Sequence, residues 1–218
     1  MRALLLASLL LVSISVSPAQ ENPPTPLLSD VFFKNLKVRA IGPAVMGGRV
    51  SDIALDLRNP AIFYVGLATG GLFKTGDNGV SFEPIFDKEG VQSIGAVAIA
   101  PSDSDVIWVG TGEANDRNSS GWGKGLFRST DGGGSWQNVE LKESRTIARI
   151  IVHPTNPEVA YAAVVGHLWA DGGERGLFKT TDGGKNWKPV LQAPAAHAAR
   201  VGCGDVAFDP SNPEVVYA

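Results

Sequence analysis

Short runs of small and β-branched apolar residues recur along the chain, separated by turn-forming residues. Four runs of similar composition lie at residues 50–55, 94–99, 148–152 and 204–208. Their alternation is weak, which is typical of strands covered on both faces. No helical period of useful length is present. The pattern therefore predicts an all-β fold.

The same order of elements follows each of these runs. A turn rich in Pro, Asn, Asp and Ser comes next, because Pro presets φ and Asn or Asp side chains bond within their own turn. A second apolar run follows, at residues 62–66, 106–110, 159–163 and 215–218. A Gly-Leu-Phe-Lys/Arg segment supplies a third strand, and the fourth begins at an aromatic residue shortly after it. Each unit is thus expected to form one four-stranded antiparallel sheet.

The third strand leads into a motif that occurs in three nearly identical copies. It reads Ser/Thr-x-Asp-x-Gly-x-x-aromatic, and its aspartates Asp77, Asp131 and Asp182 are 54 and 51 residues apart. Repeats of about 50 residues with four strands each are typical of β-propeller blades. A β-sandwich, the alternative, would not place its strands in such aligned sets. We expect a β-propeller that is incomplete here, with three blades and half of a fourth.

The chain is accordingly divided into seven predicted segments. They are a signal peptide (1–19), a Pro-rich leader (20–30), a lead-in strand (31–48), blade 1 (49–90), blade 2 (91–143), blade 3 (144–195) and part of blade 4 (196–218). A basic start, an apolar run and small residues before Ala19 predict cleavage there, so the protein is expected to be secreted or periplasmic. We expect the lead-in strand to close the ring as the outer strand of the last blade. The remaining blades would follow in a longer chain.

Charge and composition exclude several kinds of partner. The formal net charge is −3, and no basic patch interleaves with aromatic residues, so no nucleic-acid partner is expected. After the signal peptide no segment is long and apolar enough to span a membrane. Cys203 has no second cysteine to pair with and is expected to be a free, buried thiol. The three histidines show no metal-ligand spacing, and neither a metal nor a cofactor is expected.

The repeated motif resembles the Asp-box, or BNR, repeat Ser/Thr-x-Asp-x-Gly-x-x-Trp, from which the first copy departs by Phe82. In that family the motif lies at the blade periphery, which implies structural roles for Asp77, Gly79, Phe82, Asp131, Gly133, Trp136, Asp182, Gly184 and Trp187. A calcium loop, the alternative, would need spaced carboxylates that are absent. The wider chain is similar to secreted bacterial proteins described as sortilin-like, xyloglucanase-like or BNR-repeat glycosyl hydrolases.

The connections between second and third strands vary in length, unlike the other turns. They lie at residues 67–70, 111–124 and 166–175. Variable loops on a rigid scaffold are where binding sites are usually built. The predicted ligand-binding residues in these loops are Asn115, Arg117, Trp122, His167, Trp169 and Arg175. The alternative is a solvated loop whose Trp packs on its neighbour.

Two functions remain open at this point. The first is an exported scaffold that binds a protein, peptide or glycan on these loops. The second is a secreted glycoside hydrolase, which needs two carboxylates across one cleft. Resemblance to xyloglucanases implies a catalytic Asp where this chain has Ala68. Glu113 and Asp116 are the catalytic candidates that remain, a second carboxylate would come from later blades, and this segment alone is expected to be inactive.

Overall fold

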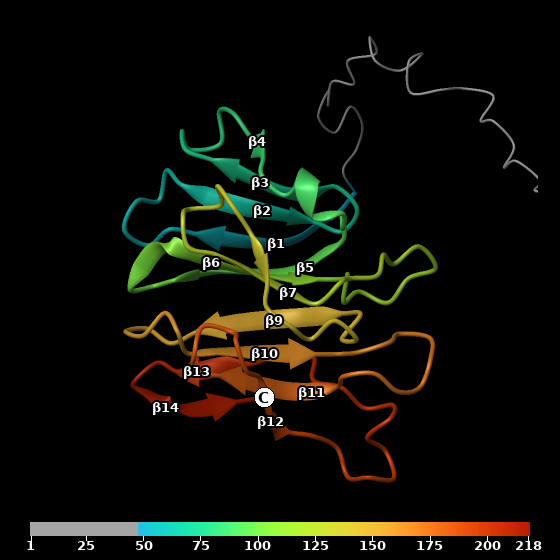
Figure 1. Ribbon diagram of the computed structural model, residues 1–218. Coiled ribbons are helices and arrows are strands. Elements are labelled where there is room, and N and C mark those ends of the chain that lie inside the picture. Colours follow the sequence, from blue (N-terminus) through green and yellow to red (C-terminus); the bar gives the residue numbers. More distant parts are fainter. Residues whose placement is uncertain (1–47) are drawn as a thin grey trace, which may run out of the picture. The chain divides into compact units, whose positions relative to one another are not determined.

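The computed structural model describes residues 48–218, which form three four-stranded antiparallel sheets and one two-stranded sheet (Figure 1). The predicted all-β fold of four-stranded units is therefore confirmed. Within these residues no helix is long and apolar enough to cross a membrane. The predicted signal peptide, Pro-rich leader and ring-closing strand lie outside the described residues, apart from residue 48.

Strand order in each sheet follows the order in the sequence. Sheet 1 contains β1 (Val50–Leu55), β2 (Phe63–Leu67), β3 (Gly71–Thr75) and β4 (Glu83–Pro84). Sheet 2 contains β5 (Ile94–Ala100), β6 (Asp103–Thr111), β7 (Leu126–Ser129) and β8 (Gln137–Asn138). Sheet 3 contains β9 (Ile147–Val152), β10 (Ala160–Val164), β11 (Gly176–Thr180) and β12 (Lys188–Leu191). Sheet 4 contains β13 (Ala207–Asp209) and β14 (Asn212–Tyr217), and one 3-10 turn, η1 (Asp87–Glu89), precedes sheet 2.

The sheets pack face to face, and their cores lie between them. One cluster of buried side chains joins sheet 1 to sheet 2 and includes Tyr64, Phe86 and Ile107. A second joins sheet 2 to sheet 3 and includes Trp108 and Ile147. Both faces of the middle sheet are therefore buried, which explains the weak alternation of its strands.

Strands β5 and β9 of neighbouring sheets approach one another closely. A Cβ added at Gly95, on β5, would lie 2.1 Å from the carbonyl oxygen of Ile147 on β9. Only glycine fits where two backbones are this close. The first strand of each four-stranded sheet also has a register shift near its start, at Val50/Asp52 in β1 and Ile94/Ala96 in β5. The same irregularity recurs opposite Ala163/Val164 in β10.

A cation over an aromatic ring recurs at the same place in all three four-stranded sheets. The aromatic lies on the second strand and the cation on the third. The pairs are Lys74 over Tyr64 at 5.6 Å, Arg128 over Trp108 at 5.2 Å and Lys179 over Tyr161 at 5.0 Å. Lys74 Nζ and the Tyr64 hydroxyl both donate to the carbonyl oxygen of Gly132 in the next sheet, at 2.8 and 3.1 Å. The Lys/Arg of the repeated motif thus helps to join neighbouring sheets.

The Asp-box carboxylate closes the turn between the third and fourth strands. In sheet 2, Asp131 Oδ1 accepts the backbone N–H of Ser135 at 2.8 Å and the hydroxyl of Ser129 at 2.7 Å. Asp131 Oδ2 accepts the Ser135 hydroxyl at 2.6 Å, and Ser129 Oγ accepts the backbone N–H of Gly133 at 2.9 Å. Asp77 and Asp182 occupy equivalent turns with the same pattern. Each carboxylate therefore has a structural use within its own turn.

The aromatic residue of the Asp-box packs on the preceding sheet. Trp136 Nε1 donates to the carbonyl oxygen of Ile85 at 2.9 Å, and its ring meets Phe86 edge to face at 5.1 Å. Trp187 repeats this contact one sheet later, donating to the carbonyl oxygen of Val139 at 2.8 Å. Phe82, at the equivalent position of sheet 1, is 45% exposed.

These turns make an acid-sensitive contribution to stability. The pKa values of Asp77, Asp131 and Asp182 fall from 3.8 to about 2, chiefly because side chains at Ser81, Ser135 and Asn186 donate hydrogen bonds to them. A carboxylate whose pKa is lowered by folding stabilises the folded state at pH values above its ordinary pKa. This stabilisation is lost as the pH falls through the lowered pKa. We expect the urea concentration at the midpoint of unfolding to decrease as the pH is lowered from 4 to 2. In Asp131→Asn this decrease should be less steep. The control Glu83→Gln, which lies outside the motif, should show the same dependence of the midpoint on pH as the wild type. The same dependence in Asp131→Asn would contradict a stabilising role for the Asp131 carboxylate.

Candidate functional site

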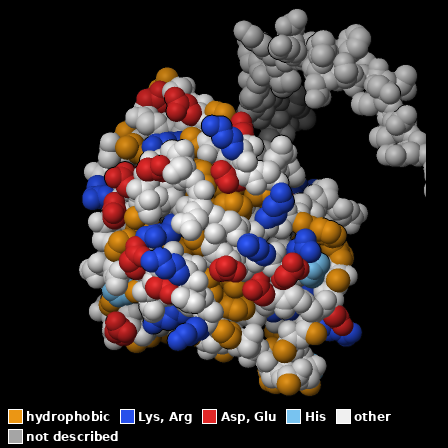
Figure 2. All heavy atoms as spheres, viewed as in Figure 1, with side chains coloured by type: hydrophobic (Ala, Val, Ile, Leu, Met, Phe, Trp, Pro, Cys, Tyr) orange, Lys and Arg blue, Asp and Glu red, His pale blue; other side chains and the backbone are white. Residues whose placement is uncertain are grey.

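Three connections form one continuous edge of the molecule, opposite the Asp-box turns (Figure 1). They are residues 112–125 between β6 and β7, residues 139–146 between β8 and β9, and residues 165–175 between β10 and β11. Because neighbouring strands are antiparallel, these connections must leave the sheets at the same edge. We call this surface the loop face. Figure 2 shows Lys and Arg side chains interspersed with Asp and Glu over the side of the molecule that it draws.

An exposed tryptophan marks the place where the loops of sheets 2 and 3 meet. Trp122 is 59% exposed, yet it contacts residues from both neighbouring connections. The His167 ring lies edge to face against it at 6.0 Å, and the Arg145 guanidinium lies 5.6 Å from the ring centroid. Two of the predicted binding residues, Trp122 and His167, are therefore brought together by the fold. Arg145 was not predicted.

A second exposed tryptophan borders a hollow in the loop of sheet 3. Trp169 is 62% exposed and lines a hollow of about 370 Å³ together with His167, Asp171 and Arg200. Arg200 Nε donates to both carboxylate oxygens of Asp171 at 3.0 Å, which ties the segment after β12 to this loop. The hollow thus has an aromatic side and a paired-charge side.

Arg175 belongs to the interior of this loop and not to its exposed surface. Its guanidinium is buried and donates to five carbonyl oxygens, those of Val165, His167, Ala170, Gly172 and Arg200. Burial lowers its pKa. Five carbonyls held by one planar cation fix the shape of the loop, because buried carbonyls need donors. The sequence indicated a ligand contact for Arg175, whereas the structure gives it a role in holding Trp169 and His167 in place.

Glu113 is likewise an anchor of its loop. It is 0% exposed and forms an ion pair with Arg49, whose Nε lies 2.9 Å from Glu113 Oε1. The backbone N–H of Glu113 donates to Ser93 Oγ, which donates in turn to the carbonyl oxygen of Gly121, both at 3.0 Å. Glu113 Oε2 has no partner among the described residues. A carboxylate in this position is closed off from a substrate, so the structure does not favour Glu113 as a catalytic acid or base.

The other predicted residues of this loop lie at its tip. Asn115, Asp116 and Arg117 are all exposed. Ser120 closes the tip, since its Oγ accepts the backbone N–H of Arg117 at 3.0 Å and donates to the carbonyl oxygen of Asn115 at 2.7 Å. These side chains are free to meet a ligand, but the tip does not bring Asp116 and Glu113 into a shared site, because Glu113 is buried beneath it.

The connection that carries Arg145 has a strained backbone. Glu140, Leu141 and Arg145 have φ values of 78°, 53° and 56°, a region that L-residues seldom occupy. The carbonyl oxygen of Arg145 accepts the backbone N–H of Gly123 at 2.8 Å. It also lies where a Cβ on Gly112 would come within 1.9 Å, so Gly112 must be glycine for this packing. Such strain is held by surrounding contacts and clusters at functional sites.

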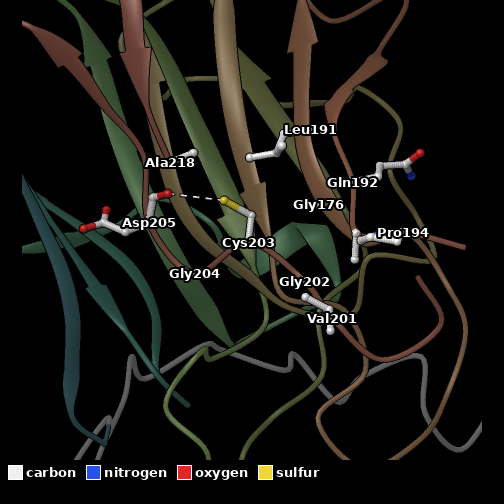
Figure 3. A pocket seen from close by; sticks show the side chains of 11 residues that line it. Gly176, Leu191, Gln192, Pro194, Val201, Gly202, Cys203, Gly204, Asp205 and Ala218 are labelled. Carbon is white, nitrogen blue, oxygen red and sulfur yellow. Dashed lines mark hydrogen bonds between the residues drawn. The ribbon is translucent and has the colours of Figure 1, made fainter. Parts of the chain in front are cut away.

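A separate cavity lies beside Cys203, between the end of β12 and sheet 4 (Figure 3). It encloses about 430 Å³, and its lining includes Leu191, Pro194, Val201 and Ala218. Cys203 Sγ donates to the carbonyl oxygen of Asp205 at 3.2 Å. Burial raises the pKa of the thiol, which opposes formation of a reactive thiolate. The cavity is therefore an apolar packing space with no evident nucleophile.

Residues 70–193 and 124–218 match the Sortilin-Vps10 family model, described as sortilin, neurotensin receptor 3. The chain belongs to the sortilin family. This confirms the family resemblance that the Asp-box repeats indicated. A comparison with curated proteins found no match. Among residues 48–218 no group of three or more His, Cys, Asp or Glu side chains is placed to hold a metal ion.

Solved structures similar to this sortilin-family chain include GH74 enzymes and YCF48. An ancestral GH74 enzyme is 23% identical, with a TM-score of 0.56 over 74% of this chain and 21% of its own. The GH74 xyloglucanase from Xanthomonas campestris is 19% identical, with a TM-score of 0.55 over 76% of this chain and 26% of its own. YCF48, solved bound to D1 peptide, is 19% identical, with a TM-score of 0.50 over 76% of this chain and 46% of its own. At these identities the likeness establishes the fold, and the chain spans less than half of each structure.

Proposed function

We propose that this protein is a binding module that holds a glycan, or a peptide segment of a partner protein, across the loop face. The observation that carries the proposal is Trp122, which is exposed but held between Arg145 and His167. An aromatic ring that is already fixed loses little conformational freedom when a ligand stacks on it. Trp169 offers a second ring in the neighbouring loop.

The buried networks beneath the loop face support the same function. Arg175 organises the loop of sheet 3, and the Arg49–Glu113 pair organises the loop of sheet 2. Buried charged groups that bond to loop atoms fix the conformation of the loop before a ligand binds. Similar folds occur in a structure with a bound peptide and in a xyloglucanase, which supports peptide and glycan as the ligand classes to test.

The described residues give less support to glycoside hydrolysis. That reaction needs an acid and a second carboxylate facing each other across the scissile bond. Glu113 is buried and paired, and buried Ala68 occupies the position where the xyloglucanase resemblance implies an aspartate. Asp116 alone remains accessible on this face among the catalytic candidates. A binding role needs neither carboxylate.

The test is the affinity of wild-type protein and Trp122→Ala for three sets of probes. These are xyloglucan oligosaccharides, oligogalacturonides and a displayed peptide library, measured by biolayer interferometry. We expect at least one set to bind, and Trp122→Ala to weaken it by about 10-fold or more, as loss of a stacked aromatic does. Phe82→Ala, an exposed aromatic at the opposite edge, is the matched control and should bind as wild type. Binding that survives Trp122→Ala would place the site elsewhere.

We also propose that the protein acts outside the cytoplasm, because residues 1–19 have the pattern of a cleavable signal peptide. Sequencing the N-terminus of protein recovered from the periplasm or the medium should find Gln20 as the first residue. A cytoplasmic protein that begins at Met1 would contradict export.

A further inference from the structure

A basic pocket adjoins Trp122 on the loop face. It encloses about 390 Å³ and is lined by Glu89, Gly123, Lys124, Phe127, Asn138, Lys142 and Arg145. These residues come from η1, from the end of the loop of sheet 2 with β7 and β8, and from the connection to sheet 3. Its volume falls at the lower end of the range of small-molecule sites and suits one or two sugar rings.

The charge of this pocket is positive and only partly neutralised. Lys124, Lys142 and Arg145 face one carboxylate, Glu89, among the lining residues. Neither lysine forms an ion pair with any described residue, and the one ion pair of Arg145 with a described residue is a long one, at 3.4 Å from Glu143 Oε2. On a protein with a net charge of −3, such a concentration of cations favours an anionic ligand.

Polar atoms behind the pocket wall also lack partners. Asn138 Oδ1 and Arg145 Nε are buried and without a hydrogen bond among the described residues. Buried polar atoms are normally satisfied, so each calls for a physical explanation. The Asn138 amide is held beside the pocket, since its Nδ2 donates to the carbonyl oxygen of Lys124 at 2.9 Å. A ligand that carries both hydroxyl groups and a carboxylate would satisfy the two atoms together.

The surrounding framework is apolar and fixed. Phe127 is buried and forms part of the pocket lining, and Arg145 connects the pocket to the Trp122 ring that it covers. The strained backbone at Arg145 is held by the bond from Gly123, and the guanidinium lies over the Trp122 ring. Flat apolar faces beside charged and hydroxyl-bonding groups match a sugar ring better than a flexible acidic side chain.

We propose that this pocket binds the carboxylate of a uronic acid residue in an acidic polysaccharide, whose neighbouring sugars lie toward Trp122. The inference rests on the proposed function and specifies its ligand class. Lys124 and Lys142 attract the carboxylate, and Arg145 donates to it by charge-assisted hydrogen bonds. The sugar hydroxyls donate to Asn138. The cationic side chains thus recognise the carboxylate of the ligand, and the Trp122 ring contacts its neighbouring sugars.

Calorimetric titration of the whole protein with oligogalacturonide tests this proposal. We expect binding to oligogalacturonide to be at least 10-fold tighter than binding to its methyl-esterified form or to xyloglucan oligosaccharide. It should weaken about 10-fold or more in Lys124→Gln/Lys142→Gln. The control Lys185→Gln/Lys188→Gln removes the same charge from exposed positions of sheet 3 and should leave affinity unchanged. Thermal melting of each variant establishes that it is folded.

Other results would overturn the inference in distinguishable ways. Equal affinity for neutral and acidic oligosaccharides, or no effect of the lysine pair, would leave the glycan-binding function standing and remove the uronate. Tighter binding of a poly-glutamate peptide than of oligogalacturonide would assign the pocket to acidic peptides. Absence of binding to every glycan and peptide probe would refute both the inference and the proposed function.

Discussion

Replacing Trp136 with alanine is expected to lower the free energy of unfolding by about 3 kcal/mol, the usual cost of removing a large aromatic from a packed contact. The Trp136 ring packs against Phe86 of the preceding sheet and its indole N–H bonds the carbonyl oxygen of Ile85. Truncation leaves a cavity between two sheets and an unpaired carbonyl. The lost stability comes from the packing of sheet 1 against sheet 2, whose buried side chains form one continuous core.

Phe82 provides a matched control within the same motif. It occupies the equivalent position in sheet 1 but is 45% exposed, and among the aromatic rings of residues 48–218 it meets only Phe63, at 5.9 Å. Phe82→Ala should therefore cost less than about 1 kcal/mol. Urea unfolding followed by circular dichroism measures both variants. If the two substitutions cost the same, the aromatic of the motif stabilises its own turn and not the contact between sheets.

Removing Arg49 is expected to destabilise the protein by about 3–5 kcal/mol, because it leaves a buried carboxylate without its partner. Glu113 is 0% exposed, and Arg49 is the ion-pair partner that compensates for the burial of its charge. The opposite substitution, Glu113→Gln, should cost about 1 kcal/mol. Arg49 keeps 35% of its side chain exposed and can be hydrated when its partner becomes neutral.

The measured quantity is the difference between the stability lost on removing Arg49 and the stability lost on neutralising Glu113. Urea unfolding of Arg49→Ala, Glu113→Gln and the double variant gives the coupling between them. The double variant should be more stable than Arg49→Ala alone, since it no longer buries an unpaired charge. Equal costs for the two single variants, or strictly additive costs, would mean that solvent reaches Glu113 and that the carboxylate is available to a ligand.

The repeated motif allowed most of the fold to be predicted, because several of its residues act locally. Asp131 bonds within its own turn, and its spacing from Asp77 reports the length of one sheet unit. Strand ends were less predictable. The fourth strand of each sheet was expected to begin at the motif aromatic, but β4, β8 and β12 begin one residue later, at Glu83, Gln137 and Lys188.

The candidate site was predicted only in part, because the sequence does not show which charged loop residues are buried. Loop length identified the segments that carry Trp122 and His167, and the fold places those two rings together. A charged residue in a loop is normally solvated, so its residue type alone did not mark Arg175 or Glu113 as interior. Arg145 escaped notice because it lies in a connection between sheets, where only the folded chain shows its contact with Trp122.

Each Asp-box tryptophan reaches back toward the N-terminus, and this direction matters during synthesis. Trp136 docks on sheet 1, and Trp187 docks on Val139 of sheet 2. A sheet leaving the ribosome therefore needs, for this contact, only surface that has already been translated. Chains commonly fold from the N-terminal end as they are made, at about 5–20 residues per second. A tryptophan that pointed forward would stay exposed until the following sheet had been made, whereas a tryptophan that points backward can bury its ring as soon as the motif appears.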